Sequence, residues 1–253
     1  MSNRYLDNGR EYSILNCTNL TIMLSYIDYM DIIMARSLGQ KLHISMDYVV
    51  REEYEILLLK EIFESEFGSA LVFKGGTALR LAYNSPRFSE DLDFTLITDI
   101  DPKKFNGFLK DLANTYPTIT HVETHEKYYT IFALVRVKED YLDRAFSIKV
   151  EISKREGKWV KEKDYTNKLI VSKVTPLTTL IQVATVEKIL EEKKDAMKNR
   201  KVARDVFDFW YINQLLKQTV KITFEGYDKK EVKAELHRLL PRHFWKVVDT
   251  WVE

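Results

Sequence analysis

Two aspartates, Asp91 and Asp93, are separated by one residue in the stretch SEDLDF. In a β-strand, residues two apart point to the same side, so these carboxylates would lie close together and repel each other. A divalent cation would remove this repulsion, and carboxylate oxygens are the ligands that Mg²⁺ prefers. Leu92 and Phe94 would face the core, but this alternation also fits a strand with one solvated face. Two interpretations stay open, a metal site or a wet strand face whose charge Arg87 partly offsets.

A Gly-Gly-Thr turn precedes the aspartates, where Gly75 and Gly76 follow a short apolar run and Thr77 opens a predicted helix. Glycine lets backbone amides approach a phosphate closely, and a helix N-terminus favours anions. Thr77 adds a hydroxyl donor. Taken alone, such a turn is more often a tight connection than a phosphate site. Combined with the two aspartates, it predicts a site in which one half binds phosphate and the other binds the neutralising metal.

A third carboxylate is needed if two metal ions are to be held, because they require more anionic oxygen than two aspartates offer. Glu151, in the stretch SIKVEIS, is the candidate. Val150 and Ile152 predict the buried face of that strand, which leaves Lys149 and Glu151 on the other. The same pattern also describes a Glu151 that is simply solvated.

Hydrophobic periodicity gives the elements that would position these residues. Helical spacing is predicted for Asn19–Arg36, His43–Phe67 with Gly68 at its end, Thr77–Tyr83, Asp101–Ala113, Leu177–Met197, Val202–Leu216 and Lys229–Leu240. In the fourth of these, Asp101 predicts the N-cap and Pro102 the first helical position. Strands are predicted for Ala70–Phe73, Asp91–Leu96, His121–Lys127, Tyr129–Val137, Ala145–Ser153 and Thr166–Val171.

The order of these elements predicts a mixed α/β (α+β) fold, with helices before the sheet and a helical segment after it. The change of pattern near Val171 to Pro176 places a boundary there, giving residues 1–172 and 173–253 as two parts. A chain of 253 residues is long enough for a substantial core in either arrangement.

The composition limits the cellular compartments and the classes of partner that we expect for this protein. The net charge of +1 does not suggest a protein coated with cations, so a nucleic-acid partner would need a local patch. Cys17 is the only cysteine and cannot form an internal disulfide, which fits a reducing cytosol. The polar start lacks a signal-peptide core, and no run approaches the ~18 apolar residues of a membrane span. We therefore expect a cytoplasmic protein without a membrane partner.

Four motifs together resemble the AbiEii nucleotidyltransferase family, the toxins of bacterial abortive-infection toxin–antitoxin pairs, within the DNA polymerase β-like superfamily. They are GGTAL, RFSEDLDF, VEIS and EKILEEKKDAMKNRKVARDVFDFWYI, which span about Leu71 to Tyr211. The resemblance implies a nucleotidyltransferase fold with a mixed sheet, flanking helices and a helical C-terminal domain. It implies that Asp91, Asp93 and Glu151 hold Mg²⁺ and that a nucleoside triphosphate (NTP) binds at Gly75 and Gly76.

The same resemblance implies that Lys193 pairs with nucleotide phosphates and that Asp205 orients Lys193 or positions the acceptor. The alternative is that Asp205 simply pairs with Lys201, as Asp208 would with Arg204, in i,i+4 pairs of the kind that any exposed helix can carry. The family pattern also places Ser89 near the triphosphate. Arg87 fits a phosphate contact and a structural brace equally well.

Two other groups of residues fit a structural role as well as a functional one. The segment from Lys188 to Arg204 is rich in lysine and arginine, so RNA could lie along it, but a charged helix is commonly just solvated. The aromatic residues of DVFDFWYI are better explained as helix core than as a base-stacking surface. The histidines show no zinc-like spacing with cysteine.

The resemblance implies a Mg²⁺-dependent enzyme that moves a nucleoside monophosphate from an NTP to an acceptor hydroxyl. It further implies a toxin with a cognate antitoxin and an acceptor such as tRNA or another RNA. Two alternatives stay open: transfer to a small molecule or protein, and a nucleotide-binding module without turnover. The low net charge favours the former, and the presence of all three carboxylates argues against the latter.

Overall fold

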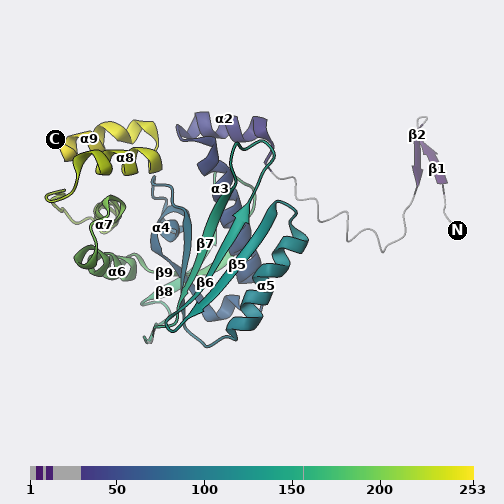
Figure 1. Cartoon of the computed structure of the whole chain (residues 1–253), viewed down its shortest axis with the longest axis horizontal. Helices are drawn as coiled ribbons and strands as arrows, with labels where there is room; N and C mark the ends of the chain where they lie inside the picture. Colours follow the sequence, from purple (N-terminus) through teal and green to yellow (C-terminus); the bar gives the residue numbers. More distant parts are fainter. Residues whose placement is uncertain (1–3, 8–9, 14–29, 156) are drawn as a thin grey trace.

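The alternating sequence in the middle of the chain forms one mixed sheet, as expected (Figure 1). The computed structural model describes residues 4–7, 10–13, 30–155 and 157–253. Its strands are β1 (Arg4–Asp7), β2 (Arg10–Ser13), β3 (Leu71–Lys74), β4 (Asp91–Leu96), β5 (Ile119–Lys127), β6 (Thr130–Val137), β7 (Phe146–Ser153), β8 (Tyr165–Ile170) and β9 (Thr179–Ala184). β1 and β2 pair only with each other, and the other seven form the sheet.

The strand order β5-β6-β7-β4-β3-β9-β8 places β4 in the middle of the sheet. β4 is antiparallel to β3 and parallel to β7. β3 is parallel to β9. The predicted mixed α/β fold is therefore confirmed, and its central strand is the one that carries the two aspartates.

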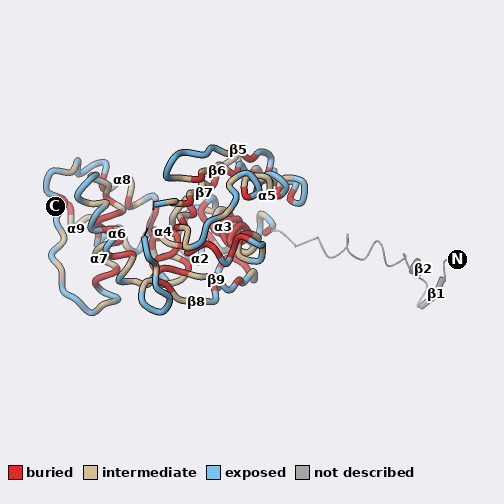
Figure 2. Tube along the Cα trace, turned by 90° about the horizontal axis from the view of Figure 1, so that it is seen from below, coloured by how far each residue is buried: buried red, intermediate tan, exposed pale blue. Residues whose placement is uncertain are grey.

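Eight α-helices surround this sheet in the described residues. They are α2 (Ile32–Leu42), α3 (Met46–Glu64), α4 (Gly75–Tyr83), α5 (Pro102–Thr115), α6 (Val186–Asn199), α7 (Ala203–Leu215), α8 (Lys229–Leu239) and α9 (Trp245–Val252). Two short 3₁₀ segments, η1 (Gly68–Ala70) and η2 (Arg242–Phe244), complete the set. Figures 1 and 2 show α6 to α9 gathered at one end of the molecule.

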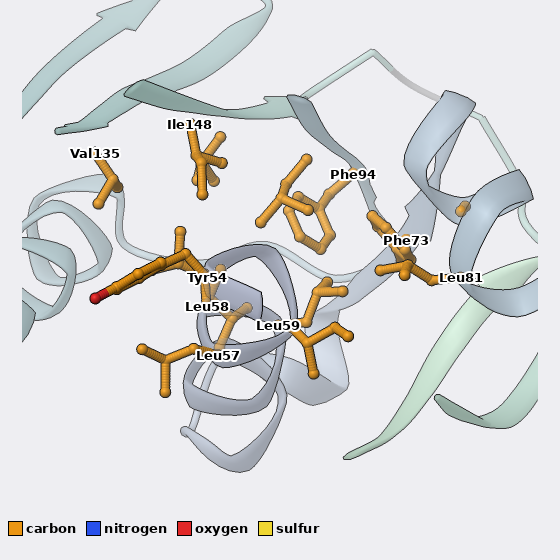
Figure 3. Close-up of a cluster of buried hydrophobic side chains, with 14 of the residues drawn as sticks. Tyr54, Leu57, Leu58, Leu59, Phe73, Leu81, Phe94, Val135 and Ile148 are labelled. Carbon is orange, nitrogen blue, oxygen red and sulfur yellow. The ribbon is translucent and has the colours of Figure 1, made fainter. Parts of the chain in front are cut away.

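Helix α3 is the centre of the main core. Its residues Ile56 to Leu59 are all buried, so the helix is covered on every side (Figure 2). Figure 3 shows Leu58 and Leu59 against Phe73 of β3 and Phe94 of β4. Each large apolar side chain buried in this way stabilises the fold by about 2 kcal/mol. This packing fixes Phe94 toward α3 and thereby turns Asp93 to the opposite face of the sheet.

The cap predicted for α5 is present. The carboxylate of Asp101 accepts hydrogen bonds from the backbone N–H groups of Lys103 at 2.8 Å and Lys104 at 3.3 Å. Pro102 occupies the first turn, where its missing N–H costs nothing.

The ends of the first two predicted helices are wrong. Residues 19–29 of the Asn19–Arg36 prediction lie outside the described residues, as does Cys17. The helix found there runs from Ile32 through Arg36 to Leu42, and left-handed His43 (φ 57°) ends it. The next helix ends at Glu64 rather than at Gly68, because the Ser65 hydroxyl and N–H both donate to the Ile62 carbonyl.

The predicted helix Leu177–Met197 is wrong in its first part. Residues Thr179–Ala184 form β9, which lies between β3 and β8, and only after Thr185 does α6 begin. Over only six residues, the apolar positions of TLIQVA fit both a helical and a strand periodicity. Pairing with β3 is what makes this segment a strand. The sheet thus extends past residue 173, the proposed start of the second part, while α6 to α9 follow it. Helix α9 was not predicted.

A second, smaller core lies among the C-terminal helices. Phe207 of α7 contacts Trp210 and Trp251, with ring centroids 5.5 and 6.2 Å apart. Val232 and Leu236 of α8 are buried in the same cluster. The interpretation of this aromatic segment as helix core is confirmed for Phe207.

Candidate active site

Three carboxylates lie on one face of the sheet, on the two parallel strands β4 and β7. Asp93 stands directly opposite Glu151, and Asp91 stands opposite Lys149. In a parallel pair, residues in register point to the same side. The structure therefore brings together the three acids that the sequence pattern suggested.

Lys149 lies between these acids, a position that the sequence analysis did not single out. Its Nζ is 3.4 Å from Oδ2 of Asp91 and 3.3 Å from Oε2 of Glu151. Burial lowers the pKa of Lys149, but the carboxylates of Asp91, Asp93 and Glu151 outweigh it and hold the pKa above its usual value. The available signal was its place two residues before Glu151, on the same strand face.

Asp93 is the acid whose charge is least favourable here. Burial raises its pKa to about 6, Asp91 and Glu151 add to the rise, and Lys149 opposes it. Among the described residues, no group of three acidic, histidine or cysteine side chains could hold a metal ion by itself. A bound cation would therefore need oxygens from a ligand in addition to these carboxylates, which is how Mg²⁺ is commonly bound with substrate phosphates.

The two glycines permit close packing around Asp93 and Arg87. Gly75 has φ +80°, and a Cβ there would lie 2.5 Å from Oδ2 of Asp93. A Cβ on Gly76 would collide with Nη2 of Arg87 and lie 3.0 Å from Oγ of Ser89. Glycine is thus favoured at Gly75 by both conformation and space, and at Gly76 by space alone.

Replacing Gly75 by alanine should therefore cost at least about 1 kcal/mol of stability, since an L-residue resists this φ, and should displace Asp93. We expect transferase activity to fall with it. Urea unfolding and an activity assay of the same preparation measure both effects. Gly107→Ala is the matched control, because a Cβ there meets nothing within 4 Å and alanine in a helix interior stabilises by up to about 1 kcal/mol. Equal behaviour of the two variants would contradict the assignment.

Thr77 and Arg87 are placed as structural ties. Thr77 is buried, and its hydroxyl donates to the backbone carbonyl of Asp91. Arg87 is 2% exposed and donates from Nε and Nη2 to the two carboxylate oxygens of Asp208, each at 2.7 Å. Of the two roles considered for Arg87, this geometry is that of a brace. Ser89 is half-buried beside Gly76.

A buried chain of alternating charges continues from Arg87 through α6 and α7. Lys193 of α6 lies 2.7 Å from Oδ2 of Asp208 and 2.8 Å from Oδ1 of Asp205. Arg200 donates from Nε to Oδ2 of Asp205 at 2.8 Å. Both aspartates are fully buried. The order is Arg87, Asp208, Lys193, Asp205, Arg200, and every carboxylate in it contacts two cations.

The cations determine how the two aspartates ionise. Burial raises the pKa of Asp208, but Arg87 and Lys193 more than compensate and hold it below its usual value. Lys193 and Arg200 do the same for Asp205. Both carboxylates are therefore ionised at neutral pH and fix the ammonium group of Lys193.

The i,i+4 pairs weighed as an alternative for Asp205 do not occur. Arg204 pairs with Glu235 of α8 at 3.0 Å, and Lys201 donates to the carbonyl of Gly226. Asp208 is the site residue that the sequence did not predict, since it was considered only as an i,i+4 partner of Arg204. Its spacing of three from Asp205 places both on one face of α7.

A cleft of about 230 Å³ joins the two halves of the site. Its walls include Gly75, Gly76, Asp93, Glu151 and Lys193. The phosphate half and the acidic half predicted from sequence thus open into one space. Arg200 stands at the same cleft.

The comparisons with known proteins agree with this arrangement. A family model described as "Nucleotidyl transferase AbiEii toxin, Type IV TA system" matches residues 57–244. The chain belongs to this family. It is an AbiEii nucleotidyltransferase, which confirms the resemblance carried by the four motifs. No curated protein matched the chain.

Three solved structures are similar to this AbiEii chain, and the first of them shares its fold. JHP933 from Helicobacter pylori has a TM-score of 0.52 and 22% identity, over 83% of this chain and 78% of its own. A putative nucleotidyltransferase from H. pylori has a TM-score of 0.49 and 20% identity, over 82% and 98%. MenT4, a nucleotidyltransferase toxin from Mycobacterium tuberculosis H37Rv, has a TM-score of 0.47 and 21% identity, over 79% and 66%. In the described part of the AbiEii chain, no helix is long and apolar enough to cross a membrane.

Proposed function

We propose that this AbiEii chain transfers a nucleoside monophosphate from an NTP to a hydroxyl of an acceptor RNA, such as tRNA, with Mg²⁺ as cofactor. The observation that carries the proposal is the cleft shared by Gly75 and Gly76 in the first turn of α4, the acids Asp93 and Glu151, and Lys193. Family membership supports the toxin role and a cognate antitoxin partner.

The donor set fits a magnesium ion. Asp91 and Asp93 offer hard oxygens on one strand face, and Glu151 lies in register beside them. Mg²⁺ is typically held by one or two carboxylates together with substrate phosphates, so this set suffices when an NTP is present. The ion would neutralise charge on the phosphates as the pyrophosphate leaves.

The chain's own residues position the reactants. The first-turn amides of α4, at Gly75 and Gly76, have no side-chain cap and would be available to the phosphates of a bound NTP. Lys193, held by Asp205 and Asp208, presents a fixed positive charge at the cleft. Glu151 completes the acidic set or accepts the proton of the acceptor hydroxyl. The acceptor oxygen would then form a bond to the α-phosphorus, while the bond between that phosphorus and the pyrophosphate oxygen breaks.

The test is transfer of label from each of the four NTPs, labelled at the α-phosphate, into total RNA and into total protein. Parallel reactions contain Mg²⁺ or EDTA. We expect one NTP to label a discrete RNA band only with Mg²⁺. Label in protein would support the alternative acceptor class. Absence of transfer with every NTP, while NTP binding persists, would overturn the proposed reaction.

A further inference from the structure

A large hollow lies outside the cleft, and five arginines are among the residues that line it. It has a volume of about 1170 Å³ and lies between the end of α2, the start of α3, residues 142–146 and residues 237–245. We call it the arginine groove after Arg36, Arg51, Arg144, Arg238 and Arg242. The backbone N–H of Arg242 donates to the carbonyl of His43 at 3.0 Å, which ties its two sides together.

The charges of the arginine groove are not balanced within the described chain. Its five guanidinium groups face two carboxylates, Asp47 and Glu90. Glu90 pairs with Arg238 at 2.9 Å. Arg51 donates to the backbone carbonyl of Ser147 at 2.7 Å.

Three arginines in the groove have head groups without an anionic partner among the described residues, although the guanidinium of Arg242 lies over the Trp245 ring at 5.9 Å from its centroid. Arg36, Arg144 and Arg242 are exposed and form no side-chain hydrogen bond or ion pair with the residues described. They come from α2, from the loop before β7 and from η2. Like charges that converge from three elements repel one another, so a net charge of +1 overall conceals a locally cationic surface.

In the basic segment suggested by the sequence, in contrast, four of the seven cations are paired with acidic side chains. Lys193 and Arg200 are held by Asp205. Lys188 pairs with Glu191 at 3.0 Å, and Arg204 pairs with Glu235. The local patch that a nucleic-acid partner would need is therefore found in the arginine groove.

The arginine groove reaches the acidic end of the sheet. Glu90, in its wall, directly precedes Asp91. Arg51, also in its wall, bonds to the carbonyl of Ser147, two residues before Lys149 on β7. The wall of the groove thus adjoins the start of β4, the strand that carries Asp91 and Asp93.

We propose that the arginine groove binds the phosphate backbone of the acceptor RNA and guides its reactive end toward Asp91. This inference rests on the proposed function. Arginine presents a planar fork of donors that matches phosphate oxygens. The groove also exceeds the ~300–1,000 Å³ of ordinary small-molecule pockets, which suits several nucleotides rather than one.

The test compares two doubly charge-reversed variants with the wild type. Arg36→Glu/Arg144→Glu changes the groove. Lys103→Glu/Lys104→Glu makes the same change of net charge at the exposed start of α5, away from it. Binding of fluorescein-labelled unfractionated tRNA is measured by anisotropy in EDTA, without NTP, across a series of salt concentrations.

We expect the groove variant to bind tRNA at least about tenfold more weakly, with the slope of log K against log[salt] reduced by about two, one per lost phosphate contact. The control should stay within about twofold. Equal losses in both variants would show a bulk charge effect and overturn the inference. Displacement of tRNA by poly-glutamate of matched charge, at similar concentration, would indicate an acidic protein partner and also overturn it. Arg36→Ala/Arg144→Ala, with thermal melting, checks that lost binding is not lost folding.

This inference and the proposed function fail in different ways. If the groove variant loses tRNA binding and the wild type transfers no nucleotide, the result supports RNA binding in the groove and rejects the proposed reaction. If the groove variant transfers nucleotide to RNA with an unchanged KM for RNA, the result supports the proposed reaction and rejects RNA binding in the groove.

Discussion

Replacing Asp91 and Asp93 together by asparagine should reduce nucleotidyl transfer at least about 10³-fold while the protein stays folded. Asparagine keeps the shape of aspartate but removes the negative charge that would hold Mg²⁺. Steady-state transfer of the preferred NTP, with Mg²⁺ varied, measures the effect. Activity within tenfold of wild type would exclude these residues as metal ligands.

The same substitution at Asp93 gives a stability test with a defined sign. The pKa of Asp93 is raised to about 6 in the folded protein, from a usual value of 3.8. The folded chain therefore binds the proton more tightly than the unfolded chain, so this group stabilises the metal-free fold as pH falls from above 6 toward 4. Asp93→Asn should flatten the change in melting temperature between pH 8 and pH 5 in EDTA. Other buried acids contribute to the wild-type slope, and the difference between the two proteins isolates Asp93.

Asp208→Ala should be the most destabilising single substitution at the site, costing about 3 to 5 kcal/mol, because it leaves the buried guanidinium of Arg87 without its partner. It also removes one of the two carboxylates that hold Lys193. We therefore expect a large fall in the urea midpoint and a loss of transfer in whatever protein remains folded.

A double variant separates the unpaired charge from the lost packing. Arg87→Met/Asp208→Leu removes both charges, and replacing a buried pair by apolar residues is often neutral. It should recover most of the stability lost in Asp208→Ala, but not the activity, since Lys193 still lacks one partner. If the double variant is as unstable as the single one, the charge argument for Asp208 is wrong.

The sequence allowed prediction of those elements whose periodicity is long or whose ends are marked. The strand Asp91–Leu96 and the cap at Asp101 were found at their observed positions. β9 was missed because its six residues carry no period of their own and become a strand only by pairing with β3. The ends of α2 and α3 depend on backbone contacts of His43 and Ser65, which composition does not reveal.

The acidic half of the candidate site was predictable because its residues lie on strands, where alternation fixes the face. Asp91, Asp93 and Glu151 needed only a parallel pairing of β4 and β7. The resemblance implied the contact between Lys193 and Asp205, but the links from Lys193 through Asp208 to Arg87 were not predictable, because they depend on how α6 and α7 pack. Alternation placed Lys149 on the face of Glu151, whereas the arginine groove emerged only in three dimensions.

The partners Arg87 and Asp208 are 121 residues apart in the chain. During synthesis the three carboxylates leave the ribosome well before α6 and α7, which carry the lysine and aspartates that complete the cleft. Because a domain generally folds as a unit, the strands that carry these carboxylates cannot complete the cleft until the later helices have been synthesised. A nascent chain that has not yet exposed α6 and α7 therefore lacks Lys193, Asp205 and Asp208, and we expect it to have no transferase activity.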